Sequence, residues 1–343
     1  MTGKEAILAA IDLQESERVP AAYFGGGMWT FEQVGETLQN VSENPERMAE
    51  VIVQVAEEIN NPIVYCGSGY NALLAAALGG TLKYRLHGSP GMVEPPLKDL
   101  ADLGTLDPTR LAEQETIQTI WKATEIVAKR LGGRFMVTAT AWGPFTLASL
   151  IYGMEPLMRA TFKAKDRVHE LVELSAELIL RFYEPLIAEG IIEMVAISDS
   201  AASGSLISRR LFNEFALPQL RKFTEKMRRM RVKTLLHICG DTNDRLDLLS
   251  ETGADIISVD NKVDLAKARE AVRGKMCLGG NLSPVSLLLY GTPEMVFEEG
   301  RKLIEALGRG GGFMLMPGCD IASNVPKENV KALLQAAAAT PLA

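Results

Sequence analysis

Short apolar runs alternate with longer amphipathic stretches along most of the chain. An uninterrupted apolar run bounded by glycine or proline, such as Phe135–Ala141, is typical of a buried strand. A stretch whose apolar residues recur every three or four positions, as within Glu43–Asn60, predicts a helix with one buried face. Strands are predicted near residues 21, 63, 136, 194, 235, 256, 278 and 314. Helices are predicted over residues 4–13, 43–60, 113–131, 166–189, 208–230, 243–251, 265–272, 293–307 and 327–338.

This alternation of strands and helices predicts a closed (β/α)8 barrel, the TIM-barrel fold. Each strand–helix–strand unit is expected to be right-handed, which builds a parallel sheet covered on both faces. We expect one domain over residues 1–343, with an irregular insertion near 70–104 that contains a hairpin around Leu82–Pro96. An open doubly wound sheet is the alternative, but no G-x-G-x-x-G motif follows the first strand, which disfavours a dinucleotide-binding fold.

The residues that directly follow the strands are the candidate site, because active sites of this fold lie at the carboxyl ends of the strands. His237 and Cys239 end the apolar run of VKTLLHICGD, and side chains two apart on a strand point to the same face. Cys319 follows another apolar run and lies beside a glycine. Imidazole nitrogen and thiolate sulfur are ligands that Zn²⁺ prefers. The strand-end residues are Cys66, Asp199, His237, Cys239, Asp260, Asn281 and Cys319.

A purely structural interpretation of these residues remains open. His237 could be a core histidine with satisfied hydrogen bonds, and the cysteines could be small buried hydrophobic residues. The remaining histidines, His87 in the insertion and His169 on a helix, are expected to be solvated. Cys277 lies within a predicted strand and is expected to belong to the core.

Composition and charge narrow the classes of function. The 343 residues are 47% hydrophobic and carry a formal net charge of −7, so no basic stripe is available to neutralise nucleic-acid phosphates. No stretch of 18 apolar residues occurs, and the amphipathic N-terminus lacks a signal-peptide cleavage site, so we expect neither a membrane span nor export. Four cysteines in a chain of this length form no disulfide framework, which favours a reducing cytoplasm.

Several motifs resemble one known superfamily along essentially the whole chain. The segments RVP, GPFTLAS, AISD, HICG, GNLSP and MPGCDIASNVP are similar to those of the uroporphyrinogen decarboxylase-like superfamily, and within it to the methylcobalamin:coenzyme M methyltransferase branch. HICG together with PGC is the part of this resemblance that is specific to the methyltransferase branch. The resemblance implies that His237, Cys239 and Cys319 bind zinc, and that Asp260 fills the fourth position when substrate is absent. The decarboxylase itself grips substrate carboxylates with an arginine-containing RQAGR-type segment, whereas the corresponding stretch here, AAYFGGGMWT, has no arginine.

The implied ligand set predicts an activity. Two thiolates and one imidazole leave zinc an open position, as in catalytic sites, and a thiol bound there is ionised at neutral pH. We therefore expect transfer of a methyl group from methylcobalamin or a corrinoid protein to a thiol acceptor such as coenzyme M. Asp199 and Asn281 are the candidates for orienting that acceptor, although both could simply cap strand ends.

Three other functions stay open at this point. They are a corrinoid-dependent methyltransferase with tetrahydrofolate as acceptor, a uroporphyrinogen decarboxylase-like tetrapyrrole enzyme, and a non-catalytic corrinoid- or porphyrin-binding protein. The expected partners are a corrinoid protein and a small-molecule methyl acceptor, with a homodimer as a further option, and neither nucleic acid nor membrane.

Overall fold

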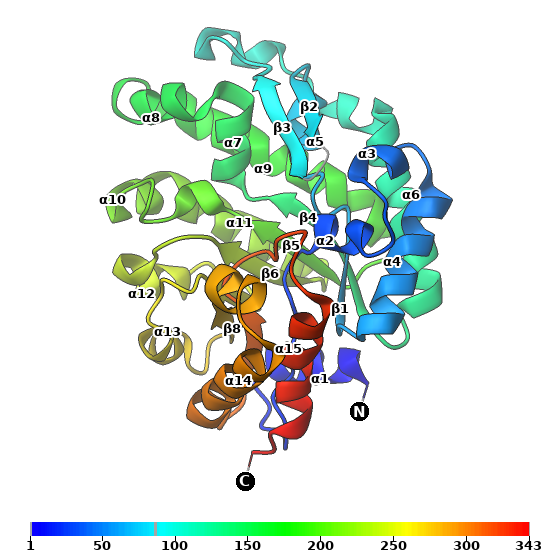
Figure 1. Cartoon of the computed structure of the whole chain (residues 1–343). Coiled ribbons are helices and arrows are strands. Elements are labelled where there is room, and N and C mark those ends of the chain that lie inside the picture. The colour runs from blue at the N-terminus through cyan, green and yellow to red at the C-terminus, as the bar shows by residue number, and fades with distance from the viewer. Residues whose placement is uncertain (1, 86–87, 343) are drawn as a thin grey trace.

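The computed structural model describes residues 2–85 and 88–342 and contains a parallel seven-stranded sheet that curls into a barrel surrounded by helices (Figure 1). Every pair of neighbouring strands in it is parallel, in the order β1-β4-β5-β6-β7-β8-β9. The strands are β1 (Ile63–Cys66), β4 (Met136–Trp142), β5 (Met194–Ser198), β6 (Lys233–Ile238), β7 (Ile256–Val259), β8 (Cys277–Leu282) and β9 (Phe313–Pro317). The predicted barrel fold is confirmed.

The main helices follow the predicted pattern of one buried and one exposed face. In α4 (Pro45–Ile59), for example, Met48, Ile52, Val55 and Ile59 are all buried. The helices around the barrel are α4, α6 (Glu115–Leu131), α9 (Lys165–Ala188), α11 (Leu217–Arg229), α12 (Leu246–Leu249), α13 (Leu265–Val272), α14 (Pro293–Leu307) and α15 (Lys327–Ala339). Helix α1 (Gly3–Ile11) packs Ile7, Ala10 and Ile11 into the barrel interior and closes its amino-terminal end.

The predicted first strand, near residue 21, is the one strand prediction that is wrong. This segment forms only a single parallel bridge, between Ala21 and Leu315 of β9. On the side that faces β1, the side chain of Asn61 takes the place of a backbone partner. The Asn61 Oδ1 accepts a hydrogen bond from the Tyr23 N–H at 3.0 Å. Gly25 and Gly26 follow with φ values of 67° and 70°, which turn the chain away from extended geometry. The segment therefore closes the barrel without forming a full strand.

Apolar side chains form two separate cores, one inside the barrel and one between the strands and the helices. Cys277 is fully buried in the inner core, which confirms the prediction for it. Cys66 is also fully buried, but it belongs to the outer core. His169 is half-buried, with its ring 4.6 Å from that of Phe215, so the expectation that it is solvated is wrong in part. The expectation for His87 lies outside the described residues.

The irregular insertion contains the predicted hairpin, formed by the antiparallel strands β2 (Thr81–Arg85) and β3 (Gly88–Glu94). Helices α7 (Pro144–Tyr152) and α8 (Met154–Lys163) were not predicted. Helix α7 is buried on almost every side, so its sequence PFTLASLIY carries no amphipathic period. The short helices are α2 (Gly27–Glu32), α3 (Leu38–Val41), α5 (Leu73–Ala76), α10 (Arg209–Leu211), η1 (Leu100–Thr105), η2 (Pro108–Glu113), η3 (Ser200–Ala202), η4 (Phe212–Ala216), η5 (Asn243–Arg245) and η6 (Pro284–Leu289).

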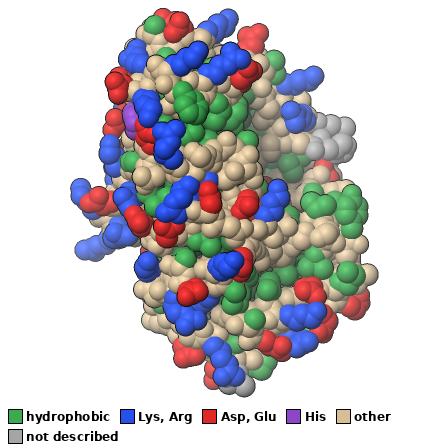
Figure 2. Space-filling view, turned by 90° about the vertical axis from the view of Figure 1, so that its left-hand side faces the viewer, with side chains coloured by type: hydrophobic (Ala, Val, Ile, Leu, Met, Phe, Trp, Pro, Cys, Tyr) green, Lys and Arg blue, Asp and Glu red, His purple; other side chains and the backbone are tan. Residues whose placement is uncertain are grey.

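The surface carries charges of both signs close together. On the face drawn in Figure 2, Lys and Arg side chains are interspersed with Asp and Glu. Many charged side chains of the molecule form exposed ion pairs, such as Arg209 with Asp247 at 2.5 Å, and such pairs contribute little to stability in water. Within the part of the chain that is described, no helix is both long and apolar enough to cross a membrane.

Candidate metal centre

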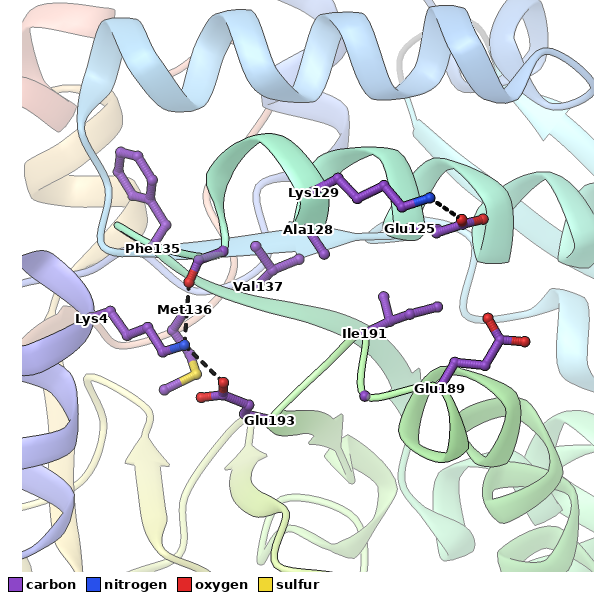
Figure 3. Close-up of a pocket in the computed structure, with 12 residues that line it drawn as sticks. Lys4, Glu125, Ala128, Lys129, Phe135, Met136, Val137, Glu189, Ile191 and Glu193 are labelled. Atoms are coloured by element: carbon purple, nitrogen blue, oxygen red, sulfur yellow. Dashed lines mark hydrogen bonds and ion pairs between the residues drawn. The ribbon is translucent and has the colours of Figure 1, made fainter.

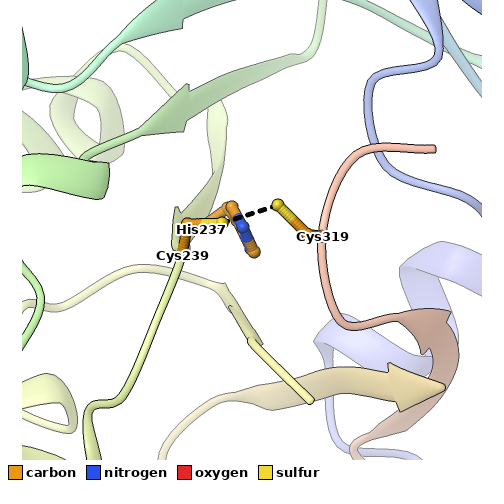
Figure 4. A group of neighbouring side chains, drawn as sticks. All are labelled: His237, Cys239 and Cys319. Carbon is orange, nitrogen blue, oxygen red and sulfur yellow. Dashed lines mark hydrogen bonds between the residues drawn. The ribbon is translucent and has the colours of Figure 1, made fainter. Parts of the chain in front are cut away.

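Three side chains of the types that bind metal ions meet at the mouth of the barrel, the end at which the parallel strands finish. His237 lies on β6, Cys239 directly follows that strand, and Cys319 comes from the loop after β9 (Figure 4). The ligand atoms of all three lie within 4.8 Å of one another, and the two Sγ atoms are 2.6 Å apart. Barrel closure therefore brings together the three residues that the sequence selected from segments about 80 residues apart.

The two ring nitrogens of His237 have different surroundings. Nδ1 lies 3.2 Å from the carbonyl oxygen of Ser258 and 3.1 Å from its hydroxyl. Nε2 is buried and has no hydrogen-bond partner among the described residues, and His237 as a whole is 1% exposed. A buried polar atom without a partner costs about 1–3 kcal/mol. An imidazole nitrogen held in this way beside two thiols fits a metal ligand.

The two thiols also fit a bound cation. The pKa of Cys239 is raised above its usual range, first by its hydrogen bond with Cys319 and then by burial. Both effects penalise the thiolate, and a divalent cation at the same position would reverse that penalty. The side chains present therefore form a donor set of one nitrogen and two sulfurs, which is the kind of set that Zn²⁺ prefers.

Asp260 lies beside the cluster, but its carboxylate is already hydrogen-bonded. Oδ2 accepts from the Gly240 N–H at 2.8 Å, and Oδ1 accepts from the Lys262 N–H at 2.9 Å. The Cys239 thiol donates to Oδ2 over 3.6 Å. The carboxylate thus holds the loop after β6 against the loop after β7. Its use as a fourth ligand stays a prediction.

Asn281, at the carboxyl end of β8, directs its side-chain amide to backbone carbonyl groups. Its Nδ2 donates to the carbonyl oxygens of Asp260 at 3.0 Å and Val263 at 2.9 Å. The side chain therefore fixes the loop that follows β7 and carries Asp260. Any influence of Asn281 on the orientation of a bound acceptor would therefore be indirect, through the position of that loop.

Asp199 is fully buried at the end of β5 and caps helix α7. Its Oδ1 accepts from both the backbone N–H and the hydroxyl of Thr146 at 2.7 Å, and its Oδ2 accepts from the Phe145 N–H at 3.3 Å. Burial raises the pKa of Asp199, and these hydrogen bonds oppose the rise. A Cβ on Gly143 would lie 2.4 Å from the Asp199 Cβ, so only glycine allows this approach. The predicted role in orienting an acceptor stays untested.

Two further polar side chains were not predicted as catalytic or metal-binding residues. The Asp320 Oδ1 accepts a hydrogen bond from the Gly26 N–H at 2.5 Å. Desolvation of the carboxyl by the surrounding protein atoms raises the pKa of Asp320 to about 6, and the hydrogen bond from the Gly26 N–H opposes that rise. The Tyr65 hydroxyl in the inner core is buried and has no hydrogen-bond partner within residues 2–85 and 88–342. A tyrosine within an apolar strand gives no signal that could have identified it, because tyrosine is common in strands.

A surface pocket of about 320 Å³ lies far from this cluster (Figure 3). It is at the amino-terminal end of β4, where the Lys4 Nζ donates to the carbonyl of Gly132 at 3.2 Å and pairs with Glu193 at 2.8 Å. This is the opposite end of the barrel from the mouth. Residues at that end of a (β/α)8 barrel contribute to stability rather than to catalysis.

Comparisons with known proteins agree over nearly the whole chain. Residues 2–340 match the family described as Uroporphyrinogen decarboxylase (URO-D). The chain is 30% identical to a methylcobamide:CoM methyltransferase, MtbA, of Methanosarcina mazei, over 98% of this chain and 97% of that protein. It is 25% identical to a uroporphyrinogen decarboxylase of Methylococcus capsulatus, over 96% and 95%. A solved structure of a methyltransferase from Methanosarcina mazei superimposes with a TM-score of 0.89 at 26% identity, covering 99% of both chains.

Proposed function

Because the chain belongs to the uroporphyrinogen decarboxylase family, we propose that it is a zinc-dependent methyltransferase that moves a methyl group from a methylated corrinoid to a thiol such as coenzyme M. The observation that carries this proposal is the unpartnered Nε2 of His237 beside the thiols of Cys239 and Cys319. The relatives named methylcobamide:CoM methyltransferases support the same activity.

In this proposal His237, Cys239 and Cys319 would hold zinc, and the bound metal would lower the pKa of an acceptor thiol so that a thiolate is available at neutral pH. A methylated corrinoid would supply the methyl group that the acceptor thiolate takes up. A carbon–sulfur bond would form as the carbon–cobalt bond breaks, and the electron pair of that bond would stay on cobalt, which would pass from cobalt(III) to cobalt(I). The protein supplies position and the activated nucleophile, while the corrinoid supplies the reactive methyl group.

The neighbouring residues have supporting roles in the proposal. Asp260, whose Oδ2 lies 3.6 Å from the Cys239 sulfur, would be a further ligand before the acceptor binds. Asn281 holds the Asp260 loop in place. Asp199 anchors the start of α7 at the same end of the barrel. A corrinoid protein is the expected donor, since a corrinoid is too large to enter the barrel and would have to approach the mouth from outside.

Decarboxylation of a tetrapyrrole is less well supported. The stretch over residues 21–30 has no arginine to pair with substrate carboxylates. Asp260 and Asp320 instead add negative charge near the same end of the barrel, which disfavours a polycarboxylate substrate.

The proposal is tested with protein purified without chelators. We expect about one zinc per chain by elemental analysis, and formation of cobalt(I), followed by absorbance without oxygen, when the protein is mixed with methylcobalamin and a thiol. Tetrahydrofolate and coenzyme M are compared as acceptors at equal concentration.

The control for this test is Cys277→Ala, which removes a cysteine from the inner core and should retain zinc and activity. Metal-free protein with full methyl transfer would contradict the zinc mechanism. Transfer to tetrahydrofolate that does not depend on added thiol would replace the thiol with a folate acceptor.

A further inference from the structure

Small residues surround His237 inside the barrel. It is in register with Ser198 on β5 and with Ser258 on β7, and Ser258 is in turn in register with Gly279 on β8. A Cβ on Gly279 would lie 2.5 Å from the Met316 sulfur, so a larger residue there would have to displace the Met316 side chain. These small neighbours leave space for an imidazole ring on the inner face of the barrel, where it packs against the ring of Phe24 at 4.8 Å.

Ser258 decides which nitrogen of that ring carries the proton. Its carbonyl oxygen, 3.2 Å from Nδ1, can only accept a hydrogen bond, so Nδ1 must be the donor. The Ser258 hydroxyl, 3.1 Å from the same nitrogen, provides a second acceptor. The opposite nitrogen, Nε2, is then left with a free lone pair, and it is the buried atom without a partner.

We propose that Ser258 is a positioning residue, which fixes His237 in the Nδ1–H tautomer and thereby presents the bare Nε2 to a divalent metal ion shared with Cys239 and Cys319. This inference rests on the proposed function and adds to it a residue outside the ligand set. A metal-ligating histidine is oriented by the group that accepts from its other nitrogen, and loss of such a group weakens metal binding about 10–100-fold.

The chain offers a matched control for this role. Ser198 flanks His237 from the other side in the same register and is also buried, but its hydroxyl lies 3.3 Å from that of Ser200 instead of contacting the imidazole. Ser198→Ala and Ser258→Ala therefore remove the same atom from the two strands that flank β6. The two variants differ in whether that atom contacts Nδ1.

The first measurement is zinc affinity, by competition with a chromophoric chelator in full-length protein. Because the Ser258 carbonyl remains in the variant, we expect Ser258→Ala to weaken zinc binding about tenfold, at the lower end of the range for such groups. Ser198→Ala should change the affinity less than about twofold, and Ser258→Thr, which keeps a hydroxyl, should stay close to wild type. Equal losses in both alanine variants, or none in Ser258→Ala, would overturn the proposal.

The second measurement needs neither metal nor activity. Nitrogen-15 NMR of the metal-free protein reports the tautomer of each of the three histidines, and His237→Ala identifies the signal. We expect a single Nδ1–H form for His237 in wild type, in Ser198→Ala and in Ser258→Ala, because the Ser258 carbonyl oxygen that selects this tautomer remains in both variants. A Nε2–H form in wild type would refute the role of Ser258. Failure of wild type to bind zinc, with the Nδ1–H form present, would count against the proposed function instead.

Discussion

Zinc should stabilise the fold measurably, because the metal-free site contains a buried nitrogen without a partner and two crowded thiols. The perturbation is removal of zinc with a chelator, followed by its return. A ligand that binds only the folded state at about 1,000 times its dissociation constant adds about 4.1 kcal/mol to the free energy of unfolding. This value includes relief of the penalty of about 1–3 kcal/mol for the unpaired Nε2 of His237.

The expected change in melting temperature follows from the length of the chain. An unfolding entropy of about 2.1 cal/mol/K per residue, applied to 343 residues, gives about 0.7 kcal/mol/K. A gain of about 4.1 kcal/mol therefore corresponds to about 6 °C. Differential scanning calorimetry with and without excess zinc measures this shift directly.

Two variants make the result specific to the site. Cys239→Ala should fold but lose most of the zinc-dependent shift, since one of the three ligands is gone. Cys277→Ala should melt lower than wild type, because truncation leaves a small cavity in the inner core, yet it should keep the full shift. No shift in wild type, or an equal shift in Cys239→Ala, would refute the assignment of this cluster as the metal site.

Two further predictions concern the residues that build the mouth. Thr146→Val removes a hydrogen bond to the buried Asp199 carboxylate and the acceptor of the Ala201 N–H at 2.9 Å, so it should cost about 3 kcal/mol by calorimetry at neutral pH. Burial raises the pKa of Asp199 in the folded state above its unfolded value, so the ionised carboxylate opposes folding. Acidification through that pKa protonates the carboxyl, so the loss of unfolding free energy in Thr146→Val should shrink as the pH falls. An equal loss at every pH would contradict this explanation. Asn281→Ala removes two hydrogen bonds to the loop after β7 and should lower both stability, by about 1–3 kcal/mol, and zinc affinity in the chelator assay. A loss of stability with unchanged zinc affinity would show that this loop does not support the metal site.

The errors in the sequence-based prediction have specific physical causes. Helix α7 was missed because it is buried on almost every side, and a helix without a polar face has no period to detect. The segment near residue 21 was predicted as a strand because its residues are apolar, and it does lie beside β9 in the barrel wall. On its other side, however, the side chain of Asn61 takes the place of backbone hydrogen bonds to a neighbouring strand. Such a substitution depends on a residue about 40 positions away, and local propensity cannot reveal it.

The sequence by itself determined the alternation of strands and helices, and with it the barrel and the end at which a site should lie. Spacing along one strand also put His237 and Cys239 on the same face, since side chains of a strand repeat every two residues. Only the tertiary structure decided the rest. Closure of the sheet brought Cys319 to the pair, and strand register put Ser258 against Nδ1 of His237 and left Nε2 bare. It also turned Asp199 and Asn281 toward backbone groups of neighbouring loops, because buried polar atoms take whichever partners packing brings within reach.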